Sequence, residues 1–290
     1  MVLVPVPGKP AAIGHNGPMT TISTVNLNGI RAASRRGLGE WLGREAPAAL
    51  LLQEVRADAD TALDLLGDRW DVVVVPSRIK GRAGVAVAVD REQGALEPGS
   101  ARDHLDEDET DVDSGRWLEV TADLGVPVRL VSAYFHSGEV GSPKQEAKMA
   151  HLPRIGARMG ELLARAAEGG PQALVAGDFN IVRSRADIKN WTPNHNKRAG
   201  VLDEEIAFLD DWVARGWRDV TRELAGEVQG PYTWWSWRGK AYDNDTGWRI
   251  DHQFTTPGLA ADATDFRIDR APSYDARFSD HAPLSVDYDL

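Results

Sequence analysis

Asp178 and Asn180 stand two residues apart directly after an apolar run, a spacing that places both side chains on the same side of a strand. The run at 173–176 has the aliphatic character of a buried strand, and Gly177 ends it. A carboxylate beside an amide can orient or deprotonate a water molecule, and active sites gather at strand ends of α/β sheets. For this pair alone, the alternative is an ordinary Asp/Asn turn after a strand.

Other expected strands end in polar residues in the same way. The strand expected at 20–25 runs into Asn26 and Asn28, and the strand expected at 48–52 runs into Glu54. Collected along the chain, the polar residues of this kind are Asn26, Asn28, Glu54, Tyr134, Asp178, Asn180, Asp251, Asp280 and His281. So many coincidences in one chain disfavour the view that each is an isolated turn.

Together these side chains form an inventory for metal-assisted hydrolysis of a phosphodiester. Mg²⁺ takes oxygen ligands, commonly one or two protein carboxylates with water and substrate phosphate oxygens, and Glu54 suits that role. A histidine can donate a hydrogen bond to phosphoryl oxygens, and a second carboxylate can fix its tautomer and keep it protonated. Plainer alternatives stay open for single residues, since Asp251 could pair with Arg249 on the surface.

The elements that must position these residues are strands mixed with helices. Alternating or aliphatic patterns predict strands at 20–25, 48–52, 70–75, 84–89, 116–123, 128–134, 173–180, 250–255 and 284–288. Helical spacing predicts helices at 34–44, 143–167 and 201–213, with Ser142 as the N-cap of the second and Pro153 as a kink or a second start. Hairpins mixed with strand–helix units indicate an α/β protein with a two-sheet core flanked by helices.

Length and composition fit a globular protein. The chain has 290 residues, of which 42% are hydrophobic, and no cysteine, so disulfides and thiolate metal sites are excluded. No apolar run approaches the roughly 20 residues that a membrane-spanning helix needs. Residues 1–18 contain four prolines and no helical periodicity, which predicts a disordered N-terminal extension followed by a single catalytic domain at 19–290.

The charge balance is acidic. Lys and Arg total 33 against 44 Asp and Glu, a net charge of −11, which taken alone argues against a nucleic-acid partner. Much of the negative charge lies in one expected loop at 103–113, outside any motif. Small basic clusters lie close in sequence to the polar strand ends, so the distribution of charge matters more than its sum.

Six segments of the chain carry a resemblance to a known family. They are Asn26-Leu27-Asn28-Gly29-Ile30-Arg31, Leu52-Gln53-Glu54, Ala133-Tyr134-Phe135, Gly177-Asp178-Phe179-Asn180, Gly247-Trp248-Arg249-Ile250-Asp251 and Ser279-Asp280-His281-Ala282-Pro283. In this order they resemble the signature of the exonuclease III family of apurinic/apyrimidinic endonucleases, within the endonuclease/exonuclease/phosphatase superfamily. The resemblance runs from about Thr20 to the C-terminus, and it implies a four-layered α/β sandwich of two packed mixed β-sheets flanked by helices.

The resemblance also implies a metal site. Glu54 would bind Mg²⁺ or Mn²⁺, assisted by Asn26 and, through water, by Asn28. Asp280 would support the metal or its water molecules. Position 28 is Asn where some members of the family have Asp, which leaves the ligand set open.

By the same resemblance, five residues would act on the phosphodiester. Asp178 would orient or activate the nucleophilic water, with Asn180 hydrogen-bonding alongside. Tyr134 would contact the scissile phosphate. His281 would stabilise the pentavalent transition state and would be oriented by Asp251.

Further residues would bind the substrate. In this family apolar side chains line a pocket for the flipped-out abasic deoxyribose, which selects by shape because an intact base costs more to extrude and does not fit. The residues at the matching positions are Trp234, Trp248 and Ile250. The candidates for phosphate-backbone contacts are Arg31, Lys144 and Arg183.

The sequence thus predicts a cytoplasmic, Mg²⁺-dependent DNA-repair nuclease, associated with the nucleoid when it acts on DNA. It would cut duplex DNA 5′ to abasic sites, digest from 3′ ends and clean blocked 3′ termini, working as a monomer without a membrane partner. One alternative is an inositol phosphatase or sphingomyelinase of the same superfamily. Another is a nucleic-acid-binding regulator that keeps the fold and has lost catalysis.

Overall fold

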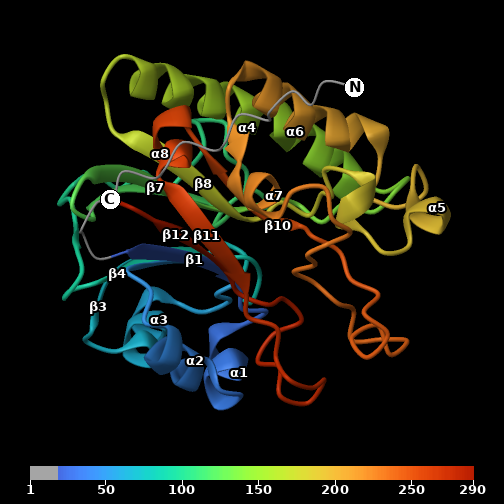
Figure 1. Cartoon of the computed structure of the whole chain (residues 1–290), viewed down its shortest axis with the longest axis horizontal. Coiled ribbons are helices and arrows are strands. Elements are labelled where there is room, and N and C mark those ends of the chain that lie inside the picture. Colours follow the sequence, from blue (N-terminus) through green and yellow to red (C-terminus); the bar gives the residue numbers. More distant parts are fainter. Residues whose placement is uncertain (1–18) are drawn as a thin grey trace, which may run out of the picture.

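The computed structural model describes residues 19–290, and the extension expected at residues 1–18 lies outside the described residues. Two six-stranded sheets pack face to face, and helices cover their outer faces, as Figure 1 shows. The predicted four-layered α/β sandwich of two mixed sheets is therefore confirmed.

The first sheet has the strand order β11-β12-β1-β2-β4-β3. Its strands are β1 (Thr20–Asn26), β2 (Ala49–Gln53), β3 (Trp70–Val75), β4 (Val85–Asp90), β11 (Ala263–Ile268) and β12 (Leu284–Tyr288). β1 and β2 run parallel, and the other neighbours run antiparallel. The carboxyl ends of β1 and β2 consequently meet at one edge of the sheet.

The second sheet has the strand order β5-β6-β7-β8-β10-β9. Its strands are β5 (Ala95–Leu96), β6 (Trp117–Asp123), β7 (Pro127–Tyr134), β8 (Gln172–Asp178), β9 (Arg218–Asp219) and β10 (Asp251–Thr255). β7 and β8 form the parallel pair, and their carboxyl ends also meet at one edge.

Helices cover the outer face of each sheet. The helices α1 (Ile30–Arg35), α2 (Leu38–Glu45) and α3 (Ala59–Leu66) pack on the first sheet, at the bottom of Figure 1. The helices α4 (Pro143–Ala167) and α6 (Asp203–Arg215) pack on the second sheet, at its top. Short helices complete the chain: α5 (Trp191–Asn194), α7 (Val220–Ala225), α8 (Pro257–Ala261) and the 3₁₀ turn Arg185–Asp187.

β2, β4 and β8 are apolar on both faces over most of their length because both faces are buried. In β8, Leu174 and Ala176 face the other sheet, while Ala173 and Val175 face the helices. Such strands read as continuous apolar runs instead of alternating ones. This explains why the aliphatic run before Asp178 was a reliable signal of a strand.

Two details of the predicted helices are wrong. The helix expected at 34–44 is two helices, α1 and α2, separated at Gly37, whose φ of 108° suits glycine and interrupts the helix. Of the two alternatives for Pro153, a kink or a second start, the second start does not occur, since α4 continues through it. The predicted N-cap is confirmed, because the side chain of Ser142 accepts a hydrogen bond from the N–H of Lys144.

Gly177 fits a close approach between β7 and β8. A Cβ atom at this position would lie 2.0 Å from the carbonyl oxygen of Ala133, and the φ of Gly177 is 143°. Only glycine relieves both constraints.

No helix among residues 19–290 combines the length and the apolar character needed to cross a membrane.

Candidate active site

The ends of five strands bring the expected site residues to one edge of the two sheets. β1 ends at Asn26, and Glu54 follows the neighbouring strand β2. β7 ends at Tyr134 and β8 at Asp178, and β10 begins at Asp251, directly opposite Asp178 in the antiparallel register. Residues far apart in the sequence therefore share one small volume.

Asp178 lies at the centre of this volume and is 1% exposed. Its Oδ1 accepts the backbone N–H of Asn180 at 2.9 Å, and its Oδ2 accepts the side-chain amides of Asn26 at 2.9 Å and Asn180 at 3.1 Å. The φ of Asn180 is 53°, a left-handed conformation that asparagine tolerates and that folds its amide back onto Asp178. Burial, together with the charges of Asp251 and Glu54, raises the pKa of Asp178.

His281 bridges two buried carboxylates. Its Nδ1 lies 2.8 Å from Oδ2 of Asp251, and its Nε2 lies 3.8 Å from Oδ2 of Asp178. Burial alone would lower the pKa of His281, but the charges of Asp251 and Asp178 outweigh burial and raise the pKa to about 10. His281 is therefore a cation at neutral pH. Its Nδ1–H is donated to Asp251, and its Nε2 lies on the side of the ring nearer to Asp178.

Glu54 is joined to Asp178 through a single amide. Nδ2 of Asn26 donates to Oε1 of Glu54 at 2.8 Å and to Oδ2 of Asp178 at 2.9 Å. The other oxygen of Glu54, Oε2, contacts the guanidinium of Arg56. Burial and the charges of Glu54 and Asp178 raise the pKa of Tyr134, so its hydroxyl stays neutral and is able to donate a hydrogen bond.

The donor set at this edge fits a hard divalent cation. Three carboxylates, those of Glu54, Asp178 and Asp251, face one imidazolium and one guanidinium, which leaves an excess of negative charge. Carboxylate and amide oxygens are the ligands that Mg²⁺ and Mn²⁺ prefer. Asp178, Asp251 and His281 also offer ligand atoms within 4.8 Å of one another, although the hydrogen bond to Asp251 already occupies Nδ1 of His281.

Asn28 and Asp280 lie against each other beside this centre. Nδ2 of Asn28 donates to Oδ1 of Asp280 at 2.9 Å, and Nε1 of Trp234 donates to the second oxygen, Oδ2, at 3.1 Å. The backbone N–H of Asn28 donates to Oδ1 of Asn26 at 2.9 Å. Asp280 is thus held from two sides, and Asn28 connects it to the side chain that joins Glu54 and Asp178.

The three apolar candidates for a substrate pocket come together next to His281. The rings of Trp234 and Trp248 meet edge to face with centroids 5.6 Å apart, and the ring of Trp234 lies 6.5 Å from that of His281. Both tryptophans are half-buried, whereas Ile250 is 5% exposed.

The three basic candidates lie apart from one another. The side chain of Arg31 is 51% exposed beside α3, and that of Lys144 is 69% exposed on a groove of about 590 Å³ that reaches Glu54. Arg183 is already engaged by a carboxylate, since its Nε donates to Asp210 at 3.2 Å. Arg31 and Lys144 are paired as well, with Asp58 at 3.5 Å and with Glu139 at 3.1 Å. Their side chains are nevertheless more accessible to a phosphate than that of Arg183, which is 23% exposed.

The acidic loop at 103–113 folds back onto its own domain. Nε of Arg154 donates to Asp106 at 2.7 Å and Nη1 to Asp113 at 3.1 Å. Arg78 pairs with another carboxylate of the loop at 3.1 Å. Part of the loop's negative charge is therefore neutralised within the chain.

Lys148 is a supporting residue that was not predicted from the sequence. Its side chain is fully buried, and its Nζ donates to the carbonyl oxygen of Asn180 at 3.0 Å and lies 2.8 Å from Glu205. Lys148 thus fixes the turn that carries Asp178 and Asn180. A signal was present, because Lys148 occupies the same helical face of 143–167 as the apolar Leu152.

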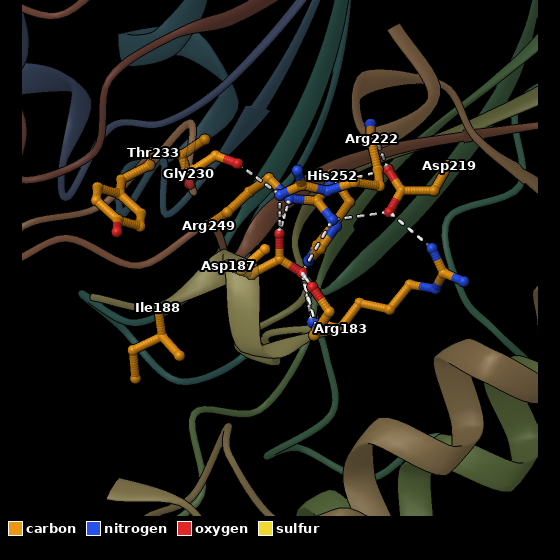
Figure 2. A network of polar contacts seen from close by, with 12 residues as sticks. Arg183, Asp187, Ile188, Asp219, Arg222, Gly230, Thr233, Arg249 and His252 are labelled. Atoms are coloured by element: carbon orange, nitrogen blue, oxygen red, sulfur yellow. Dashed lines mark hydrogen bonds and ion pairs between the residues drawn. The ribbon is translucent and has the colours of Figure 1, made fainter. Parts of the chain in front are cut away.

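Arg249 was also missed, and it does not pair with Asp251 on the surface. It is fully buried, with Nε donating to Asp187 at 2.6 Å and with Nη1 and Nη2 donating to Asp219, both at 2.8 Å. Figure 2 shows this guanidinium between the two carboxylates, with Arg222 approaching Asp187 as well. The network ties the segment after β8 and the start of α7 to the residues that precede β10.

Residues 23–281 match the endonuclease/exonuclease/phosphatase family. This range contains every site residue from Asn26 to His281. A curated exodeoxyribonuclease from Bacillus subtilis is 26% identical over 262 residues, covering 90% of this chain and 96% of that protein.

Solved structures are similar over almost the whole chain. An AP endonuclease from Archaeoglobus fulgidus superposes with a TM-score of 0.78 at 24% identity, covering 94% of this chain and 100% of that one, which shows the fold. The 3′ phosphatase NExo from Neisseria, bound to a product DNA hairpin, superposes with a TM-score of 0.78 at 25% identity, covering 93% and 100%.

Proposed function

The chain belongs to the endonuclease/exonuclease/phosphatase family, and we propose that it is a Mg²⁺-dependent DNA-repair nuclease that cuts duplex DNA 5′ to abasic sites. It is a nuclease of the exonuclease III and AP endonuclease type. The proposal includes digestion from 3′ ends and removal of blocked 3′ termini, an activity named for the similar 3′ phosphatase from Neisseria. We expect it to act as a cytoplasmic monomer on nucleoid DNA.

The observation that carries the proposal is the placement of Asp178 between Glu54 and the imidazolium of His281. A water molecule bound to Asp178 gives its proton to a carboxylate whose pKa is raised by burial. The Nε2–H of His281 and the hydroxyl of Tyr134 donate to phosphoryl oxygens as charge builds on them. The water oxygen bonds to phosphorus as the bond from phosphorus to the 3′ oxygen breaks, and the leaving 3′ oxygen takes a proton from solvent. The products therefore carry a 3′-hydroxyl and a 5′-phosphate.

The metal enters this scheme as a charge partner. Glu54 would hold it, with Asn26 beside Glu54, Asn28 acting through water, and Asp280 supporting the bound water molecules. When bound, Mg²⁺ or Mn²⁺ would polarise a phosphoryl oxygen and offset negative charge in the transition state. The excess of carboxylates over cations around Glu54 supports this part of the proposal.

Selectivity for an abasic site would come from the pair of tryptophans. Trp234 and Trp248 lie edge to face beside His281, and both pack against the buried cluster that contains Ile250. A deoxyribose without its base would pack against such rings more readily than a complete nucleotide, and a nucleotide without a base also costs less to extrude.

A labelled duplex that carries one synthetic abasic site tests the proposal. With Mg²⁺ we expect a single cut 5′ to the site, with EDTA no cut, and with the matched intact duplex only slow digestion from the 3′ end. A second duplex that ends in a 3′-phosphate tests end cleaning. Binding without any cut would favour the non-catalytic regulator. Neither binding nor cutting would favour a phosphatase or sphingomyelinase.

A further inference from the structure

Arg277 is a buried cation that forms no ion pair with any of the described residues, although the charges of Asp280 and Asp243 act on it from farther away. Its side chain is 5% exposed, its Nε and Nη1 donate to the carbonyl oxygens of Tyr274 at 3.3 Å and Trp235 at 3.1 Å, and its Nη2 has no hydrogen-bond partner. The other buried arginines of residues 19–290, Arg158 and Arg249, are each paired with a buried carboxylate. Arg277 therefore departs from the pattern of this chain.

An unpaired buried charge is costly, so its surroundings should show what offsets the cost. The guanidinium carbon of Arg277 lies 4.1 Å from the ring centroid of Trp237, 4.3 Å from that of Tyr242 and 4.5 Å from that of Tyr274. Ring faces attract a cation but do not cancel its charge. Consistent with this, burial lowers the pKa of Arg277.

A cavity of about 570 Å³ adjoins this cation. Arg277 lines it together with Arg36, an exposed residue just after α1 whose guanidinium carbon lies 5.7 Å from the ring centroid of Trp237. Arg36 makes no ion pair with the described residues. Among residues 19–290, the only carboxylate lining the cavity is that of the exposed Asp275, so two guanidinium groups face one carboxylate.

The cavity lies next to the reaction centre. Two of its lining residues, Asn28 and Ser279, contact site residues directly. Nδ2 of Asn28 donates to Asp280 at 2.9 Å, and Oγ of Ser279 donates to the carbonyl oxygen of Asn26 at 2.6 Å. An anion in the cavity would therefore sit beside a phosphodiester that reacts at Asp178.

We propose that this cavity is a second phosphate subsite, which binds a backbone phosphate of DNA near the scissile one. Arg36 binds the phosphate, and Arg277 supplies positive charge from the cavity wall. The ring of Trp237 lies within cation–π distance of both guanidinium groups. The inference rests on the proposed function, because it takes DNA as the substrate. It adds Arg36 and Arg277 to the residues that hold the strand.

Neutralising single phosphates tests the subsite. The probe is the abasic duplex with one uncharged methylphosphonate placed in turn at each position near the lesion, and binding is measured by anisotropy in EDTA so that the strand stays intact. For the unmodified chain we expect one position at which methylphosphonate weakens binding several-fold. In Arg36→Met, methylphosphonate at that position should weaken binding no further. The slope of log K against log salt should fall by about 0.9, the value for one phosphate contact.

Arg35→Met is the matched control. Arg35 is exposed in the last turn of α1, one residue from Arg36, and it does not line the cavity. Arg35→Met should still lose affinity when methylphosphonate is placed at that position, as the unmodified chain does; this loss of affinity is called the penalty below. Arg277→Lys, which keeps the charge, should keep the penalty, whereas Arg277→Gln should lose it.

The outcomes separate the subsite from the proposed function. If Arg36→Met and Arg277→Gln keep both the penalty and the salt slope of the unmodified chain while that chain binds and cuts the duplex, the subsite is refuted and the proposed function stands. If Arg277→Gln fails to fold, as shown by its melting curve, Arg36→Met alone decides. If the unmodified chain binds no DNA, both proposals fall.

Discussion

His281 and Asp251 form a buried pair in which Nδ1 of the imidazole lies 2.8 Å from Oδ2 of the carboxylate. Asp251 is opposite Asp178 in the strand register, so the same two strands that carry Asp178, the proposed proton acceptor, also fix the cation across from it. The pair therefore sets both the charge and the orientation of the imidazole.

Asp251→Asn should remove that charge while keeping the shape of the side chain. Without the carboxylate, His281 is less readily protonated and less firmly oriented, so its Nε2–H is lost to the phosphoryl oxygens. We expect kcat on the abasic duplex to fall by roughly 10²–10⁴-fold, as for loss of a positioned acid. An unchanged kcat in a folded variant would show that His281 does not act through Asp251.

Asp178→Asn should abolish cleavage and raise stability together. The amide cannot accept the proton of water, so kcat should fall by at least about 10²-fold, while DNA binding persists. Because the pKa of Asp178 is raised, its ionised form is disfavoured in the folded state, and a neutral isostere relieves that cost. A melting temperature below that of the unmodified chain would contradict this account of the carboxylate cluster.

Arg249→Lys should slow catalysis from outside the reaction centre. Lysine cannot span Asp187 and Asp219 at once, so Trp248 and Asp251, the neighbours of Arg249 in the chain, should shift. Displacements of this kind lower kcat/KM by about 10-to-100-fold.

The matched control for Arg249→Lys is Arg158→Lys, which weakens a similar buried pair with Glu119 away from the site. Both variants should lose roughly 1–3 kcal/mol of stability. Assays run below both melting temperatures should find only Arg249→Lys impaired. Equal kinetics in the two variants would reduce Arg249 to a purely structural role.

His252 should make stability depend on pH in a mildly acidic window. Burial and the charge of Arg249 lower its pKa from 6.5 to about 4, so the folded chain holds the neutral form. A lowered folded pKa gives a contribution that is complete above about pH 6.5 and is lost as the pH falls toward 4. The contribution is on the order of 3 kcal/mol.

His252→Gln keeps a donor for the carbonyl oxygen of Ile181, which Nε2 of His252 contacts at 2.8 Å. Its free energy of unfolding should fall less steeply between pH 6.5 and 4 than that of the unmodified chain. His136 and His151, whose pKa values are also lowered, keep part of the slope in both proteins. Parallel curves would mean that His252 is not neutral in the folded chain.

The strand ends could be predicted from the sequence because their signal is local. An apolar run that stops at a polar pair marks Asp178 and Asn180 wherever the rest of the chain lies. The same holds for Asn26 and Glu54, and the structure brings all of these residues to one edge. Within each sheet this follows because neighbouring parallel strands end on the same side, and the packing of the two sheets then brings the two edges together.

The supporting contacts could not be predicted in this way because their partners are distant in sequence. Arg249 reaches Asp187 and Asp219 across 62 and 30 positions, and neither aspartate lies in a periodic segment. Arg249 therefore looked like a surface residue next to Asp251. The break at Gly37 could not be predicted for a different reason. Glycine is compatible with the helical pattern of this segment, yet Gly37 adopts a left-handed conformation and divides the helix.

The contact between position 177 and the carbonyl oxygen of Ala133 limits how this chain can change. Any side chain at 177 would push β7 and β8 apart, and with them Tyr134 and Asp178, which are paired at the ends of those strands. The distance between the phenol of Tyr134 and the carboxylate of Asp178 thus depends on the absence of a Cβ atom at Gly177. In a mutational library screened for cleavage, position 177 should tolerate no replacement, although glycine has no side chain to take part in the reaction.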